Sequence, residues 1–130
     1  MAKIISFLKY IFHISVILLI VVSLFPGSLL GFLFYHDLSR QPILFENPFG
    51  TSVNHFISYF YISILGLCLY LRNEKFQKLV YILFFLSIML EVLQSTVPNR
   101  AFQFYDLIGN FFGVLVAYFL VKTYLYFNKT

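Results

Sequence analysis

Four long apolar runs, separated by polar stretches, are the feature that most constrains this chain. They cover approximately residues 4–25, 53–71, 76–97 and 104–127. Each is close to the length of about 20 residues that an α-helix needs to cross the hydrocarbon core of a bilayer. In that environment only helices and closed barrels satisfy their own backbone hydrogen bonds. We therefore expect an all-α, multi-pass membrane protein whose four transmembrane helices form a compact bundle.

The composition leaves no room for a separate soluble domain. Of the 130 residues, 61% are hydrophobic and 11% are charged, whereas soluble proteins average about 25% charged residues. The net charge of +4 does not indicate nucleic-acid binding, because Lys and Arg stand scattered at the ends of apolar runs. Cys68 is the single cysteine, which predicts neither an internal disulfide nor a metal site. We expect one domain over residues 1–130, without metal or cofactor.

Two segments outside the centres of these runs need separate interpretation. Pro26 and Gly27 end the first run, and the apolar stretch 28–35 is too short to cross the membrane again. This stretch is expected to extend the first helix past a kink or to lie at the interface.

The first run also begins with a charged residue followed by an apolar core, the order found in a signal peptide. Its core exceeds the usual about 7 to 15 residues and no Ala-x-Ala site follows, so an uncleaved helix fits better.

The distribution of Lys and Arg predicts the orientation, because these residues are in excess on the cytoplasmic side. If the helices alternate in direction, Arg40 and Arg100 fall on one side of the membrane. The other basic residues fall on the opposite side: Lys3, Lys9, Arg72, Lys75, Lys78, Lys122 and Lys129. We therefore expect both termini in the cytoplasm, and the first loop (residues 36–54) and the third loop outside.

The same alternation gathers polar side chains at the outer ends of the last three helices: His55, Glu91, Gln94, Arg100, Asp106 and Asn110. Ionisable groups at membrane depth are costly, and by default they are candidates for function. His55 can change charge near neutral pH, although a loop carbonyl could simply satisfy it. Glu91, about six residues inside its run, needs a cation, a proton or water. Arg100 could form a structural salt bridge with Glu91 or Asp106, or bind a phosphate or carboxylate ligand.

Spacing on the fourth helix predicts an inward-facing stripe. Asp106 and Asn110 lie one turn apart, and the same face continues to Gly113 and Ala117. Gly109 forms a Gly-x-x-x-Gly pair with Gly113, which permits close approach between membrane helices. We expect this stripe to pack against the second or third helix. Taken alone, Asp106 has a simpler interpretation, since a carboxylate at a helix start can act as its N-cap.

An ordered set of residues resembles the VanZ-like family of small bacterial membrane proteins: His55, Glu91-x-x-Gln94, Arg100 and Asp106-x-x-x-Asn110-x-x-Gly113. This resemblance covers nearly half of the chain. Where the family pattern often has Asp-Lys shortly before the His, this chain has Thr51 and Ser52. The resemblance implies a multi-pass protein of the bacterial inner membrane, and the family's namesake is associated with resistance to the glycopeptide teicoplanin. It implies no established reaction.

Several functions remain open. The first is an outer-face site for an anionic or lipid-linked cell-envelope ligand such as a cell-wall precursor, with Arg100 and His55 engaging the anion while Glu91 and Asp106 orient them. The second is a non-catalytic accessory subunit of a larger membrane protein complex, in which the polar cluster fixes helix register. Catalysis would use the His and carboxylates to move protons at a lipid phosphate. It is disfavoured because no nucleophile elbow, P-loop or metal-binding pair is present. A channel is disfavoured because the charges gather at one face.

Overall fold

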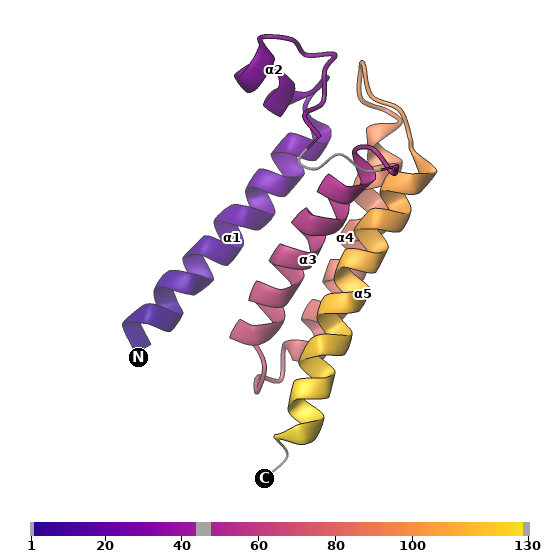
Figure 1. Ribbon diagram of the computed structural model, residues 1–130. Coiled ribbons are helices and arrows are strands. Elements are labelled where there is room, and N and C mark those ends of the chain that lie inside the picture. The colour runs from indigo at the N-terminus through magenta and orange to yellow at the C-terminus, as the bar shows by residue number, and fades with distance from the viewer. Residues whose placement is uncertain (1, 44–47, 129–130) are drawn as a thin grey trace.

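The chain folds as a bundle of helices in the computed structural model, which describes residues 2–43 and 48–128. The helices of the described chain are α1 (Ala2–Leu24), α2 (Leu29–Tyr35), α3 (Ser52–Leu69), α4 (Phe76–Gln94) and α5 (Phe104–Phe127) (Figure 1). All but the short α2 are long and apolar enough to cross a membrane. The expected all-α architecture with four candidate spans is confirmed. Lys129 and residues 44–47 of the first loop, which entered the predictions above, lie outside the described residues.

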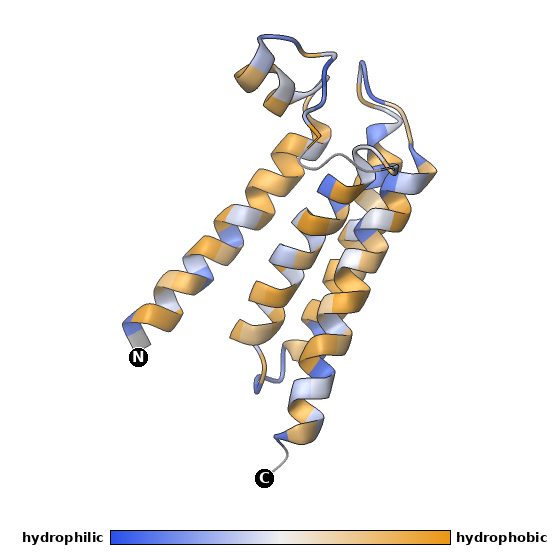
Figure 2. Ribbon diagram, viewed as in Figure 1, coloured by the Kyte–Doolittle hydropathy of each residue, from blue (hydrophilic) through white to orange (hydrophobic). Residues whose placement is uncertain are grey.

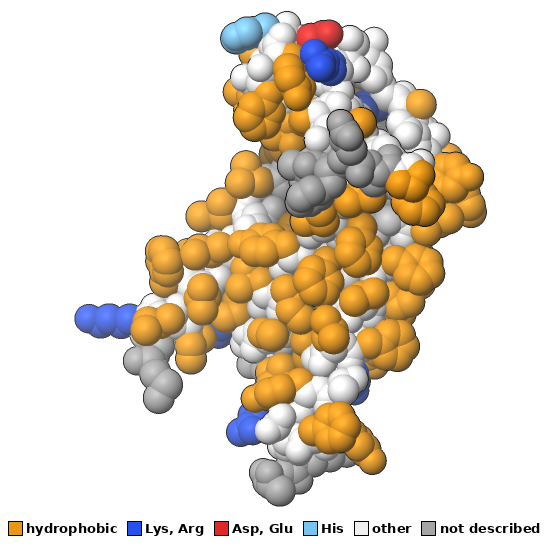
Figure 3. Space-filling model, in the orientation of Figure 1, with side chains coloured by type: hydrophobic (Ala, Val, Ile, Leu, Met, Phe, Trp, Pro, Cys, Tyr) orange, Lys and Arg blue, Asp and Glu red, His pale blue; other side chains and the backbone are white. Residues whose placement is uncertain are grey.

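The bundle has a three-helix body, formed by α3, α4 and α5, with α1 along one side (Figure 1). The most extensive contact is between α3 and α5. α1 touches α3 and α4 and leans away from them towards its N-terminal end. Apolar side chains cover the flanks of the bundle, and hydrophilic residues gather mainly towards its two ends (Figures 2 and 3). This distribution suits a protein whose flanks contact lipid and whose ends contact water.

The interior of the body is apolar over most of its length. Leu67 of α3, Leu83 of α4 and Val114 of α5 are fully or almost fully buried. α1 adds the ring of Phe12, which packs on Gly66 of α3 so closely that a Cβ at Gly66 would lie 2.5 Å from the ring. Core packing therefore joins α1, α3, α4 and α5, and α1 is the least buried of these long helices.

The chain turns sharply after α1, as the sequence predicts. Pro26 cannot continue the hydrogen bonding of the helix, and Gly27 has φ +84°, a left-handed conformation that glycine adopts without steric cost. Ser28 then caps the next helix, because its Oγ accepts a hydrogen bond from the Gly31 amide at 2.9 Å. The apolar stretch after the proline is thus a separate short helix, α2, at the end of the bundle opposite the termini (Figure 1).

α4 ends at Gln94, earlier than the expected end at Val97. The next residues form tight turns, in which the amides of residues 95, 96 and 97 bond to the carbonyls three residues earlier at 3.2, 3.0 and 3.1 Å. Pro98 follows these turns and cannot donate a backbone hydrogen bond to the Gln94 carbonyl, so the helical pattern does not resume. Glu91 therefore lies in the last turn of α4. The expectation that it lies about six residues from the helix end was wrong.

Candidate functional site

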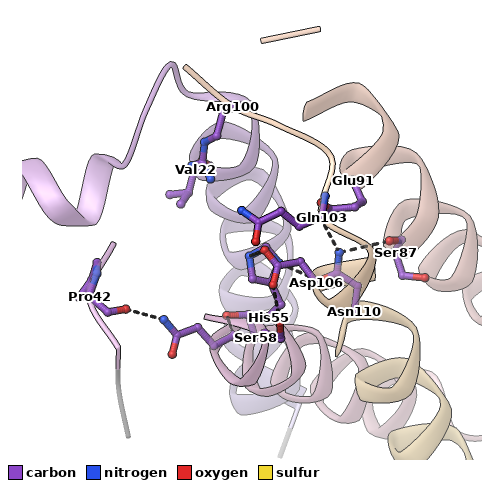
Figure 4. Close-up of polar contacts among 12 residues, drawn as sticks. Val22, Pro42, His55, Ser58, Ser87, Glu91, Arg100, Gln103, Asp106 and Asn110 are labelled. Atoms are coloured by element: carbon purple, nitrogen blue, oxygen red, sulfur yellow. Dashed lines mark hydrogen bonds and ion pairs between the residues drawn. The ribbon is translucent and has the colours of Figure 1, made fainter. Parts of the chain in front are cut away.

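Buried polar side chains meet at the end of the bundle opposite the termini (Figure 4). His55 comes from α3, Glu91 from α4, and Asp106 and Asn110 from α5. We call these four residues the polar network. The side chain of His55 is 17% exposed, and the other three residues are between 0% and 2% exposed. Polar groups this deeply buried must bond to one another to offset the loss of water.

Asn110 lies at the centre of the polar network. Its Nδ2 donates to the Ser87 carbonyl oxygen at 3.3 Å and to Glu91 Oε2 at 3.4 Å. Its Oδ1 lies 2.9 Å from His55 Nδ1. Since Ser87 O and the Glu91 carboxylate are both acceptors, the amide nitrogen must be the atom that faces them. The amide oxygen then accepts from His55, so His55 Nδ1 carries a proton.

The other side of the His55 ring faces Asp106. His55 Nε2 lies 3.4 Å from Asp106 Oδ2, and Asp106 Oδ1 accepts a hydrogen bond from Ser52 Oγ at 2.6 Å. Because Nδ1 already carries a proton, a neutral His55 would direct the Nε2 lone pair at a carboxylate. His55 and Asp106 therefore form an ion pair when Nε2 also carries a proton.

Glu91 ties α4 to the segment that precedes α5. Its Oε1 accepts the backbone amide of Gln103 at 2.9 Å, and its Oε2 accepts from Asn110. Gln103 is also the N-cap residue of α5. The alternative in which Asp106 serves as the N-cap was wrong, because Asp106 instead lies in the first turn and bonds to α3. Within the described residues, no group of three or more His, Cys, Asp or Glu is placed to hold a metal ion.

Arg100 contacts α1. Its Nε donates to the Phe25 carbonyl at 3.3 Å and its Nη2 to the Val22 carbonyl at 3.0 Å (Figure 4). A cation bonded to the last carbonyls of a helix satisfies them and interacts favourably with the helix dipole. Burial lowers the pKa of the Arg100 guanidinium, and the charges of Glu91 and Asp106 oppose that shift. The alternative in which Arg100 forms a salt bridge with one of these carboxylates is not seen among the described residues.

Replacing Arg100 by Ala should loosen the end of α1. The variant loses two charge-assisted hydrogen bonds, each of which contributes about 1.5–3 kcal/mol when well formed. We therefore expect hydrogen exchange in residues 20–24 to accelerate at least tenfold. The matched control is Arg40→Ala, which removes a positive charge at the same end from a side chain stacked 4.0 Å from the Tyr35 ring. Unchanged exchange at residues 20–24 in Arg100→Ala would contradict this role.

Two hollows adjoin the polar network. The first, of about 100 Å³, lies between α1, α2 and α3, and His55 is part of its lining. The second, of about 450 Å³, lies beside the segment that joins α4 to α5, and Asp106 is part of its lining. Three side chains line both hollows: Gln41, Gln94 and Arg100. These hollows and their shared wall form the candidate site.

Gln94 is the unusual residue of this site. The residue as a whole is only 4% exposed, and its side-chain amide makes no hydrogen bond to another described residue. The amide is nevertheless not sealed off, because Ser63 Oγ is the one enclosed side-chain atom without a partner in the described part of the chain. The Gln94 amide therefore faces the two hollows that it lines, where a water molecule or a ligand would be its hydrogen-bond partner. Gln94 shares the inward face of α4 with Glu91, one turn away, as the spacing predicts.

The small residues of α5 lie against α3. A Cβ built on Gly109 would lie 2.5 Å from Ser52 O, and one built on Gly113 would lie 2.6 Å from Phe56 O. Ala117, one turn further along the same face, is fully buried. The stripe therefore lies at the main helix–helix contact, and its close approach brings Asp106 and Asn110 within reach of His55.

Sequence reasoning missed several participants. Ser52 lies one turn before His55 on α3, and this spacing could have identified it as a partner for Asp106. It stands in the Thr51-Ser52 pair where the family pattern often has Asp-Lys. Ser87 and Gln103 take part through backbone atoms, which leave no sequence signal. Gln41 reaches the hollows through loop folding, which helical periodicity does not predict.

Comparison with known families decides what kind of protein has this arrangement. A protein-family model described as VanZ/LLP1 matches residues 5–126, nearly the whole chain. The chain belongs to the VanZ/LLP1 family. Comparison with curated proteins and with solved structures gives no significant match. The resemblance noted over His55–Gly113 thus extends through all four long helices of this VanZ/LLP1 protein, and both hollows lie within the matched segment.

Proposed function

We propose that this VanZ/LLP1 protein binds the anionic headgroup of a cell-envelope molecule in the two hollows. The observation that carries the proposal is Gln94, whose side-chain amide bonds to no other described residue and lines both hollows beside Arg100. An amide that faces a hollow next to a guanidinium is suited to an oxygen-rich anion such as a phosphate or carboxylate. The ligand class that we favour is a lipid-linked cell-wall precursor or a related anionic lipid.

Arg100 would supply the positive charge. Two of its five N–H donors bond to carbonyls of Val22 and Phe25, and the other three have no partner among the described residues. The guanidinium is thereby held in one orientation with donors to spare. An orienting contact of this kind lowers the entropic cost of binding.

The polar network has a supporting role in this proposal. Both ring nitrogens of His55 already face Asn110 and Asp106, so His55 offers no free donor to a ligand in the first hollow. This differs from the expectation that His55 itself engages the anion. The Lys and Arg bias and the family membership support placing the site on the outer face of a bacterial inner membrane.

Gln94→Leu provides the cleanest test. Stability should be nearly unchanged, because Leu has a similar size and the Gln94 amide makes no hydrogen bond to another described residue that the substitution would remove. Ligand binding should fall about tenfold, since the amide would otherwise bond to the anion. Native mass spectrometry of protein from mild detergent measures the retained ligand, and thermal unfolding measures stability in the same sample.

The comparison set for this experiment comprises Arg100→Ala and Arg40→Gln. Arg100→Ala should lose the ligand almost completely, although its effect on α1 makes it less specific. Arg40→Gln removes one positive charge at the same end without altering the lining of either hollow, and should retain the ligand. A ligand that persists in both Gln94→Leu and Arg100→Ala would refute the proposed site.

A second candidate is the non-catalytic accessory subunit of a larger membrane complex. It is supported by the way the members of the polar network saturate one another, as expected of a device that fixes helix register. Under this hypothesis Glu91→Gln impairs assembly and stability without changing small-molecule binding. A protein partner that copurifies stoichiometrically, with no small molecule bound, would favour this candidate over ligand binding.

A further inference from the structure

A cleft separate from the two hollows of the candidate site lies at the other end of the bundle, where the termini are. It has a volume of about 490 Å³ and separates α1 from α4, close to the turn that joins α3 to α4. Ligand pockets of proteins are typically about 300–1,000 Å³. The residues of the candidate functional site do not line it. The cleft is therefore a distinct site that the proposed function does not use.

The cleft is long and apolar inside. It runs along α4 from Lys75 to Leu86, roughly 16 Å at the helical rise of 1.5 Å per residue. Phe12 and Ile17 form part of the α1 wall, and Ile82 is part of the α4 wall. Ile17 and Ile82 are 60% and 42% exposed, so the groove opens on an apolar surface and matches a hydrocarbon chain better than it matches a polar solute.

The mouth of the cleft is cationic. Lys75 and Lys78 of the α4 start line it, together with His13 and Tyr70. Lys9 lies just beyond, with its Nζ 5.3 Å from the centre of the Tyr70 ring. None of the described lining residues is acidic, although Glu74 is in the same turn. Positive charge at the mouth and an apolar interior are complementary to an amphipathic molecule with an anionic head.

We propose that this cleft binds one anionic phospholipid, with its phosphate between Lys75 and Lys78 and an acyl chain between α1 and α4. The lipid lies between α1 and α4, on the side where α1 leans away from the other helices, and so attaches the least buried of the four long helices to α4 (Figure 1). Lysines near a membrane surface attract anionic headgroups, and the cytoplasmic leaflet is the richer in such lipids. This agrees with the orientation expected from the Lys and Arg distribution.

Native mass spectrometry from nanodiscs of phosphatidylcholine and phosphatidylglycerol tests the charge requirement. The wild type should retain one phosphatidylglycerol in preference to phosphatidylcholine. The double variant Lys75→Gln/Lys78→Gln should retain it at least tenfold less, because each lysine contributes separately to headgroup attraction. The control Lys3→Gln/Lys122→Gln removes equal charge at the same end of the bundle from side chains that do not line the cleft, and should bind normally.

Filling the groove tests whether binding also requires space for an acyl chain between α1 and α4. Ile82→Trp puts a large ring in the path of the acyl chain while all lysines remain, and should also abolish retention of phosphatidylglycerol. Ile88→Trp is matched, because Ile82 and Ile88 are 42% and 44% exposed on the same helix and only Ile82 lines the cleft. Equal retention of both lipids by the wild type would overturn the proposal. So would equal losses in the lysine variant and its control, or undiminished binding in Ile82→Trp.

Discussion

Asp106→Ala is expected to destabilise the bundle by about 3–5 kcal/mol, the usual cost of removing one partner of a buried charged pair. Asp106 is 2% exposed and joins two groups of α3, the Ser52 hydroxyl and the His55 ring. Without the carboxylate, Ser52 loses its acceptor. His55 also loses the partner of Nε2 at a position largely shielded from water. The free energy of unfolding, measured by SDS titration in mixed micelles, should report the loss directly.

Asp106→Asn should be far milder, by an argument that depends on the proton positions. The Asn oxygen can still accept from Ser52. Its amide nitrogen can donate to Nε2 of a neutral His55, while Nδ1 of that ring continues to donate to Asn110. The hydrogen-bond geometry survives and only the charges are lost, so we expect less than about 1 kcal/mol of destabilisation.

The control for both Asp106 variants is Asp37→Ala. Asp37 is an exposed carboxylate at the same end of the bundle, and Ser39, in its own turn, is the one described residue to which its side chain bonds, so its removal should leave the unfolding free energy nearly unchanged. If Asp106→Asn proves as damaging as Asp106→Ala, the negative charge itself stabilises the network and the neutral arrangement is not accessible. An Asp106→Ala protein of normal stability would mean that the network contributes nothing to helix packing.

Gly113→Ala is expected to force α3 and α5 apart. Its new Cβ would lie 2.6 Å from Phe56 O and 2.9 Å from Phe60 N, and backbone atoms within a helix cannot move individually. Overpacking of this kind costs about 1–3 kcal/mol, which exceeds or cancels the gain of up to about 1 kcal/mol in helix propensity. Gly109→Ala meets Ser52 O at 2.5 Å and should act in the same direction.

The double variant Gly109→Ala/Gly113→Ala should lose less than the sum of the single losses, because one displacement of α5 relieves both clashes. Gly66→Ala is the control for an equally close contact with a side chain in place of a backbone. Its Cβ would also lie 2.5 Å from a neighbour, but that neighbour is the Phe12 ring, which can rotate. We therefore expect a smaller loss of stability at Gly66. Unfolding free energies that rank Gly66→Ala as the most damaging would contradict the backbone-contact argument.

The sequence alone determined the membrane architecture. The hydrophobic runs are long enough to span a bilayer, and a proline or polar residues separate them. Such runs must form helices there, because lipid offers no hydrogen-bond partner to unpaired backbone N–H and C=O groups. The convergence of His55, Glu91, Asp106 and Asn110 also followed from the alternating direction of the helices. Helical spacing by itself places Gly109 and Gly113 on the face of Asp106. These are consequences of local periodicity, which is encoded residue by residue.

The hydrogen-bond partner of each polar group depends instead on how the helices pack. From the sequence Arg100 could reach either carboxylate, and it bonds instead to carbonyls at the end of α1. Ser52 donates a hydrogen bond to Asp106. The Gln94 amide faces the hollows and bonds to no other described residue. These choices depend on crossing angles, turn geometry and exposed backbone carbonyls, which bring together groups far apart in the chain. Periodicity specifies the face on which a side chain lies, whereas packing between helices specifies which group it meets.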